Sequence, residues 1–198
     1  MSIITKQTIA NTLSFDEYLK LTEDIINSPT PAEVYKDEKL MRFTKENYER
    51  MNRLKSFTNI ESKLYNELQK LNESWTWIVI TEPWCGDASQ IVPVLNLISQ
   101  SNNKIAFRIL LRDTNLDVMD AYLTNGGRAI PKLICVNSET LEEIGVWGPR
   151  PAVLQDIVLA NKELSLGEKV KLIHAWYDEN KTLAIQEEFI DLIKQWKI

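Results

Sequence analysis

The sequence contains few cysteines and almost no histidine. Among its 198 residues are two cysteines, Cys85 and Cys135, and one histidine, His174. Two cysteines fifty residues apart cannot form the disulfide framework of a small secreted protein. One histidine and two distant cysteines also provide no cluster of metal ligands. We therefore expect a reducing, cytoplasmic environment, no metal and no cofactor.

The chain has fewer basic than acidic residues, and it lacks long apolar runs. The 23 lysines and arginines are outnumbered by 28 acidic residues, which gives a formal net charge of −5. No apolar run approaches the ~20 residues of a membrane-spanning helix, and residues 1–11 lack the apolar core of a signal peptide. Because an acidic protein is repelled by phosphate-rich surfaces, we expect neither a nucleic-acid partner nor a membrane partner.

The most informative stretch is residues 81–93, TEPWCGDASQIVP. A run of strand-forming residues precedes it and a helical apolar pattern follows it, so Cys85 lies at a strand-to-helix junction. Unpaired backbone N–H groups and the helix dipole favour a thiolate there. The position predicts an exposed nucleophile with a lowered pKa. The alternative is an inherited, unreactive cysteine, because the Asp87 carboxylate two residues on disfavours the thiolate.

Two sequence blocks carry a family resemblance. Trp84, Cys85 and Gly86 open the predicted helix, Pro93 lies within it, and residues 128–133 (RAIPKL) follow later. Together they resemble the thioredoxin superfamily, whose signature is Trp-Cys-Gly-Pro-Cys at a helix start followed by Arg-Gly-Ile-Pro-Thr-Leu. In that family the second proline is cis and lies against the active-site cysteine.

The resemblance implies a peptide-binding groove beside the cysteine. The Ile130–Pro131 bond is expected to be cis, and the backbone before the proline would pair with an extended peptide, as in strand addition. Ile130 and Trp84 could instead only cover the edge of the core. The six positions that match the family's groove are Trp84, Gly86, Asp87, Ile130, Pro131 and Gly148.

The chain departs from the family where the redox chemistry is concerned. Ala88 stands in place of the second, resolving cysteine. Val79 replaces the family's buried aspartate, and the place of its partner lysine falls near Ile109. The joint loss of both charges is physically reasonable, because losing only one of them would leave an unpaired charge in the core, which is costly. Arg128 and Arg150 are candidates for positive charge near the thiol.

Alternating strands and helices predict an α/β fold, with a thioredoxin-like central mixed sheet flanked by helices. N- and C-terminal helical additions complete it. We divide the chain into an extension (1–57), a thioredoxin-like domain (58–162) and a C-terminal addition (163–198). Expected strands are 75–81, 105–111, 131–136 and 141–147, with a possible edge strand at 2–5. Expected helices begin near Ser14, Asp37 and Asn59 and also cover 87–101, 117–123, 152–161, 167–178 and 182–197.

Two functions are compatible with these residues. The first is single-cysteine thiol–disulfide exchange, in which Cys85 reacts with a protein or low-molecular-weight thiol or disulfide and an external thiol releases it. The second is a redox-inactive binding protein that uses the groove beside Pro131. Cys135 is expected to be a buried core residue too distant to pair with Cys85. His174, on a predicted helix, is expected to have a surface or packing role rather than to form a cysteine–histidine pair.

Overall fold

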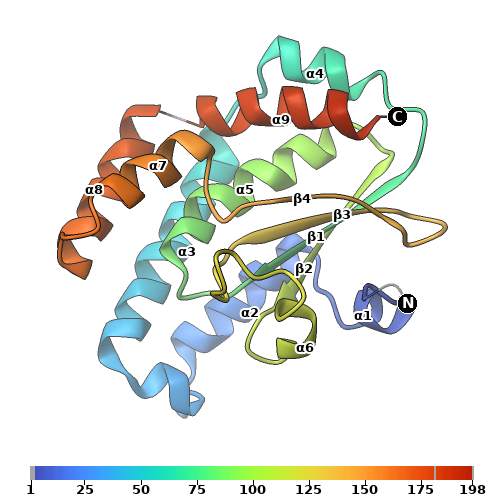
Figure 1. Cartoon of the computed structure of the whole chain (residues 1–198). Helices are drawn as coiled ribbons and strands as arrows, with labels where there is room; N and C mark the ends of the chain where they lie inside the picture. Colours follow the sequence, from blue (N-terminus) through green and yellow to red (C-terminus); the bar gives the residue numbers. More distant parts are fainter. Residues whose placement is uncertain (1–2, 181, 198) are drawn as a thin grey trace.

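The computed structural model describes residues 3–180 and 182–197, and they form a mixed sheet of four strands with helices packed around it (Figure 1). The strand order is β2-β1-β3-β4. β1 (Trp75–Thr81) and β2 (Ile105–Leu111) are parallel, whereas β3 (Lys132–Asn137) is antiparallel to both β1 and β4 (Glu143–Trp147). The predicted α/β fold with a central mixed sheet is confirmed, and all four main strands lie within two residues of their expected ends.

β1 is the centre of the molecule. All seven of its residues are buried, because it has a strand on each edge and side chains packed on each face. A continuous run of bulky and β-branched residues suits such a strand. The strand ends at Thr81. The residues that follow therefore leave the sheet at the carboxyl end of this interior strand, and helix α5 (Gly86–Gln100) begins there.

The N-terminal third of the chain is helical, and its caps explain the boundaries. α1 covers Lys6–Ala10, α2 Phe15–Asn27, a 3-10 turn Glu33–Lys36 and α3 Glu38–Phe57. Ser14 caps α2 in a reciprocal capping box with Glu17, the arrangement that a hydroxyl followed by an acid three residues on predicts.

Three sequence-based expectations for local structure are wrong. Residues 3–5 form no strand, because Thr5 caps α1 instead, and Ser2 lies outside the described residues. α4 covers Ser62–Leu68 and is preceded by Glu61, so Asn59 does not cap it. α6 covers only Leu116–Met119. It ends early because the chain turns tightly between Thr124 and Gly127, which pair their backbones, with Asn125 and Gly126 at positive φ.

The C-terminal part contains α7 (Ala152–Ala160), α8 (Leu166–Asn180) and α9 (Leu183–Trp196). The predicted separation of the last two helices is confirmed. Lys181 lies outside the described residues, and Thr182 after it has a φ of 73°. Within the described ranges no helix is long and apolar enough to cross a membrane.

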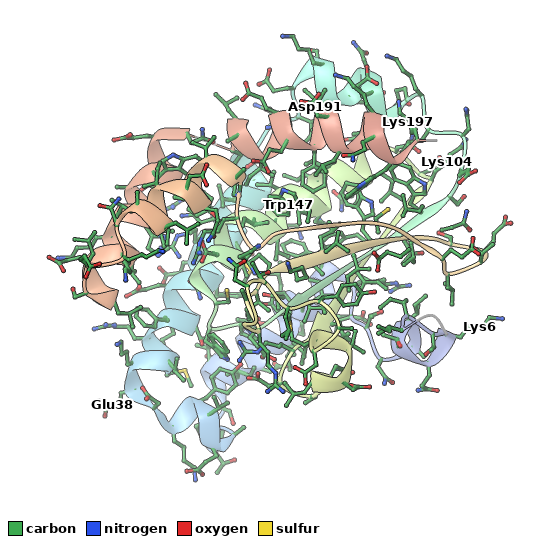
Figure 2. All side chains as sticks on the ribbon, in the orientation of Figure 1. Lys6, Glu38, Lys104, Trp147, Asp191 and Lys197 are labelled. Atoms are coloured by element: carbon green, nitrogen blue, oxygen red, sulfur yellow. The ribbon has the colours of Figure 1, made fainter. Side chains whose placement is uncertain are left out.

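An aromatic cluster attaches α9 to the sheet. The Phe189 ring lies 5.2 Å from the rings of both Trp77 and Trp147, and the Trp196 ring lies 6.2 Å from that of Trp75. Figure 2 shows Trp147 near the middle of the molecule, while charged residues such as Asp191 point outward. Such tilted and edge-to-face pairs add about 0.5–1.5 kcal/mol each beyond the area that they bury. The C-terminal helix is therefore part of the hydrophobic core, and the domain division at residues 57 and 162 stays a prediction.

The contact between Trp196 and β4 requires a glycine. A Cβ atom on Gly145 would lie 2.1 Å from Nε1 of the Trp196 indole. We predict that Gly145→Ala lowers the free energy of unfolding by about 1–3 kcal/mol, because the ring must move out of a packed site. Chemical denaturation of the full chain measures this change.

Gly167→Ala is the matched control. A Cβ atom there meets nothing within 4 Å, and Gly167 lies inside α8. Because alanine favours a helix over glycine by up to about 1 kcal/mol, this variant should be as stable as the parent or more so. Equal losses in the two variants would show that the Trp196 contact is not the cause.

Candidate functional site

Cys85 is the N-cap residue of α5 and lies four residues beyond Thr81, the last residue of the buried strand β1. Only 7% of its surface is exposed, and its thiol donates to the carbonyl of Ile130 at 3.4 Å. The predicted strand-to-helix junction is therefore present. The thiol is turned toward the loop before β3 and lies in the protein rather than on its surface.

The expected exposed thiol with a lowered pKa is wrong. Burial raises the pKa of Cys85 to about 12, and the Asp87 carboxylate acts in the same direction. Backbone N–H groups of Ala88 and Asp87 and the Arg150 guanidinium lower it, but by less. The helix start does favour the thiolate, as the sequence indicates, but desolvation outweighs it because the sulfur has little contact with water. Cys85 is therefore protonated near neutral pH.

Asp87 is held by an ion pair that the sequence did not predict. Arg150, which follows β4, donates from Nε to Oδ1 at 2.9 Å and from Nη2 to Oδ2 at 2.6 Å. The hydroxyl of Tyr177, from α8, donates to Oδ1 at 3.3 Å, and Arg150 also donates to Gln155. Because this carboxylate is 9% exposed, these partners replace its water. Arg128, the other candidate cation, is paired with Asp120 at the surface.

Three of the six predicted groove positions, Ile130, Pro131 and Gly148, lie in the chain directly before β3 or directly after β4. The Ile130–Pro131 peptide bond is cis, and Gly148 packs against it. A Cβ atom on Gly148 would lie 2.5 Å from the carbonyl oxygen of Pro131, and Gly148 has a φ of 107°, so only glycine fits. Ile130, Pro131 and Gly148 lie on the β3 and β4 side of the thiol, and Ile130 is 7% exposed.

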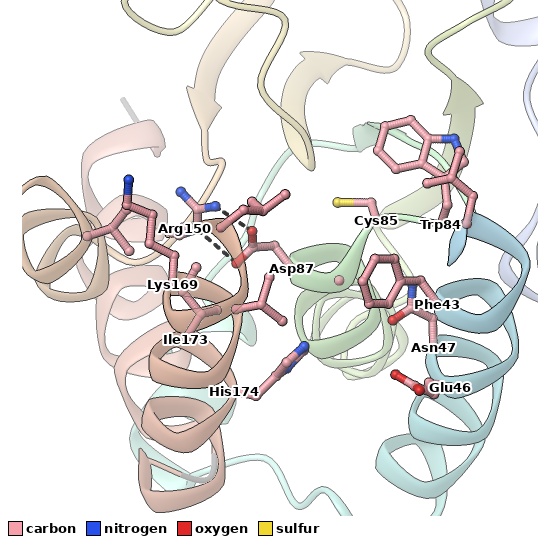
Figure 3. A pocket seen from close by; sticks show the side chains of 15 residues that line it. Phe43, Glu46, Asn47, Trp84, Cys85, Asp87, Arg150, Lys169, Ile173 and His174 are labelled. Atoms are coloured by element: carbon pink, nitrogen blue, oxygen red, sulfur yellow. Dashed lines mark hydrogen bonds and ion pairs between the residues drawn. The ribbon is translucent and has the colours of Figure 1, made fainter. Parts of the chain in front are cut away.

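The other predicted positions, Trp84, Gly86 and Asp87, line a cavity that has Cys85 in its wall. Its volume is about 360 Å³, within the usual range for small-molecule sites. Figure 3 shows α8 on one side, α3 on the other and the start of α5 between them. The lining residues are Leu40, Phe43, Glu46, Asn47, Trp84, Cys85, Gly86, Asp87, Arg150, Val158, Leu166, Lys169, Val170, Ile173 and His174.

Most of this lining was not identified from the sequence. Leu40 and Phe43 belong to the apolar stripe of α3, which is indistinguishable from a stripe that packs on a core. Asn47 is 2% exposed, and its amide donates to the carbonyl of Pro83 at 3.0 Å, which holds α3 against the loop that leads to Cys85. The one sequence signal for this lining was Asn47, a polar residue on the apolar stripe of α3.

His174 lines this cavity, a position that the sequence did not indicate. Its Nδ1 is 3.3 Å from Nε2 of Gln90 on α5. A Cβ atom on Gly86 would lie 3.6 Å from both Cε1 and Nε2 of the ring. Burial lowers the pKa of His174, and the nearby Arg50 guanidinium lowers it further. The imidazole is therefore neutral near pH 7.

The missing charge pair of the family is replaced by two apolar neighbours. Val79 on β1 is directly paired with Ile109 on β2, and both are fully buried. The register therefore supports the assignment of these two positions. Cys135 is likewise fully buried, opposite Trp77 on β1, as expected. Both cysteines are free. The described residues contain no group of three or more potential metal-ligating His, Cys, Asp or Glu side chains.

Glu82 is a buried acid that the sequence analysis overlooked. It is 6% exposed, and Oε1 accepts from the backbone N–H of Asp113 at 2.8 Å. Burial raises its pKa to about 7, although the Asp113 N–H bond lowers it. The position of Glu82 directly after β1 is a sequence signal for a buried acid, because a charged residue that follows a fully buried strand must find a partner or lose its charge.

The raised pKa of Glu82 predicts a pH-dependent stability. A protonated Glu82 favours the folded state, so this contribution is present below pH 4.5 and is lost as the pH rises from about 4.5 to about 7. Glu82→Gln stays neutral and keeps the acceptor oxygen. We predict that the unfolding free energy of this variant, measured relative to the wild type, increases by up to about 3 kcal/mol when the pH is raised from 4.5 to 8. Urea denaturation at the two pH values measures the difference.

Glu187→Gln is the control, because Glu187 is exposed on α9. Its difference from wild type should be the same at both pH values. If the Glu82→Gln difference is also independent of pH, the buried carboxyl titrates normally and this account of the site is incorrect.

The environment of Cys85 predicts its alkylation behaviour. With a pKa of about 12, the rate of reaction with iodoacetamide should rise about tenfold per pH unit from pH 7 to pH 10 without a plateau. At every pH Cys85 should react more slowly than free N-acetylcysteine and faster than Cys135, which is fully buried. Peptide mass spectrometry separates the two sites. A plateau below pH 9 would contradict the prediction.

Two solved structures share the fold of this chain. A protein of unknown function from Pseudomonas aeruginosa aligns over 94% of this chain and 95% of its own, with 16% identity and a TM-score of 0.60. An HIV epitope scaffold aligns over 95% and 96%, with 16% identity and a TM-score of 0.61. A thioredoxin from Trichomonas vaginalis covers 52% of this chain and 93% of its own, with 20% identity and a TM-score of 0.32. No curated protein matches. Residues 34–171, well over half of the chain, match the family model described as thioredoxin, and the protein therefore belongs to the thioredoxin family.

Proposed function

We propose that the protein is a thioredoxin-fold binding protein that takes a small apolar molecule in the cavity beside Cys85. The observation that carries the proposal is the cavity itself: about 360 Å³, with a mainly aliphatic and aromatic lining and a protonated thiol in its wall. Apolar clefts of this size with a few polar groups are the usual form of small-molecule sites. The groove beside Pro131 is not used in this proposal.

The helical additions acquire a role in this function. The walls of the cavity come from α3, which lies within residues 1–57, and from α8, which lies within residues 163–198. In the proposed division of the chain, the central domain supplies Cys85 together with Trp84 and Val158, and the additions supply the rest of the apolar lining. Since both cysteines are free, a reducing compartment such as the cytoplasm suits the protein.

A single-cysteine exchange reaction is the second candidate. It is favoured by the backbone N–H groups of Asp87 and Ala88, which stabilise negative charge on the sulfur. The Cys85 thiolate would attack one sulfur of a disulfide, forming a mixed disulfide and releasing the other sulfur as a thiolate that takes a proton from water. No second thiol is positioned to resolve it, because Ala88 occupies that place and Cys135 is buried, so an external thiol would be needed. A Cys85 pKa below 9 in the alkylation measurement would favour this candidate.

The binding proposal is tested with pentylbenzene, an apolar molecule of suitable size. We expect saturable binding to the wild-type protein by isothermal titration calorimetry, and slower alkylation of Cys85 when the cavity is occupied. Val170→Trp places an indole in the cavity lining and should weaken binding at least about tenfold, or 1.4 kcal/mol.

Lys171→Trp is the matched control, because Lys171 neighbours Val170 on α8, is exposed and does not line the cavity. It should bind as the wild type does. Absence of binding, or binding that leaves Cys85 alkylation unchanged, would contradict the proposed function.

A further inference from the structure

Most polar groups that line the cavity are already engaged within the protein. The Asn47 side chain donates to the carbonyl of Pro83 and accepts from the Arg50 guanidinium. The Asp87 carboxylate accepts from Arg150 and Tyr177. The remaining interactions are those of Lys169 with the carbonyl of Lys162 and of Glu46 with Arg42. None of these side chains needs a ligand to complete its hydrogen bonding.

His174 differs from them. Gln90 is 5% exposed, and its side-chain nitrogen can only donate, so Nδ1 of the imidazole accepts and the ring proton lies on Nε2. No hydrogen-bond partner of Nε2 is found among the described residues. This nitrogen faces Gly86, directly after Cys85, and Figure 3 shows the ring pointing from α8 toward the start of α5.

We infer that His174 donates a hydrogen bond from Nε2 to an acceptor on an uncharged, otherwise apolar ligand, with Gln90 as the positioning residue that fixes the ring. The inference rests on the proposed binding function and names the class of its ligand. A fixed donor in an apolar site selects an acceptor strongly, because leaving either group unpaired on binding is costly.

The charges of the lining indicate that the ligand is uncharged. Glu46 and Asp87 contribute two negative charges, and Arg150 and Lys169 contribute two positive charges, so the formal charges cancel. The Asp87–Arg150 pair already satisfies its own members. A charged ligand would lose its hydration, which is unfavourable, and Lys169, the lining cation with no acidic partner among the described residues, already donates to the carbonyl of Lys162.

The volume of the cavity limits the size of the ligand. At the ~30 Å³ that one water molecule occupies in the liquid, a cavity of about 360 Å³ holds roughly a dozen non-hydrogen atoms. Medium-sized ketones, esters or ethers with an aliphatic or aromatic body fulfil these conditions.

Three probes with the same phenyl-alkyl body test the inference: valerophenone with a carbonyl acceptor, pentylbenzene with none, and 5-phenylpentanoate with a negative charge. Calorimetry on the wild type should give the tightest binding for valerophenone and the weakest for the carboxylate. His174→Phe keeps an aromatic ring but removes the donor. It should weaken valerophenone binding roughly two- to tenfold, the usual effect of one hydrogen bond, and leave pentylbenzene binding within about twofold.

Gln90→Leu tests the positioning role, since it keeps His174 and removes the partner of Nδ1. The preference for valerophenone over pentylbenzene should shrink in this variant as well. Equal losses for both probes in His174→Phe, or tightest binding of the carboxylate, would overturn the inference while leaving the cavity as a binding site. Failure of all three probes to bind or to protect Cys85 from alkylation would overturn the proposed function itself.

Discussion

The ion pair between Asp87 and Arg150 ties three parts of the chain together at the start of α5. Asp87 lies in the first turn of that helix, Arg150 follows β4, and Tyr177 joins from α8. Since the carboxylate is almost fully buried, removing Arg150 would leave an uncompensated charge in the protein, which is far more costly than the loss of a surface pair. Through the Tyr177 hydroxyl this buried pair connects α8, and with it one wall of the cavity, to the start of α5.

The pKa of the Cys85 thiol is raised mainly by burial. The Asp87 carboxylate of this ion pair raises it further, because it opposes a second negative charge beside it. The family's redox devices are absent together: Ala88 stands at the resolving position, and Val79 and Ile109 form an apolar pair. These changes are mutually consistent. The buried acid and the second thiol act in thiol–disulfide exchange, and that reaction starts from a thiolate, which a protonated Cys85 does not supply.

The cavity is a product of both ends of the chain. α3 and α8 lie on opposite sides of the start of α5 (Figure 3), although more than a hundred residues separate them in the sequence. The sheet positions Cys85 rigidly, while the helices determine what can approach it. Binding sites on a fixed scaffold can change their specificity in this way without any change in the sheet.

The sequence by itself determined the family, the central sheet and the boundaries of most helices. Their signals are local: the Trp84–Gly86 and 128–133 blocks, the buried run of β1, the caps such as Ser14 and the interruption of the tail helix before Thr182. Apolar periodicity and capping depend on residues a few positions apart, so a single sequence contains them.

Only the tertiary structure decided the state of the thiol and the location of the candidate site. The sequence placed Cys85 at a helix start but could not show how much water reaches it, and desolvation reversed the expected direction of its pKa shift. It also gave no sign that Arg150 pairs with Asp87 or that His174 lies beside Gly86. These properties depend on side chains that are distant in the chain and adjacent in space, and burial and Coulomb energies follow spatial distance alone.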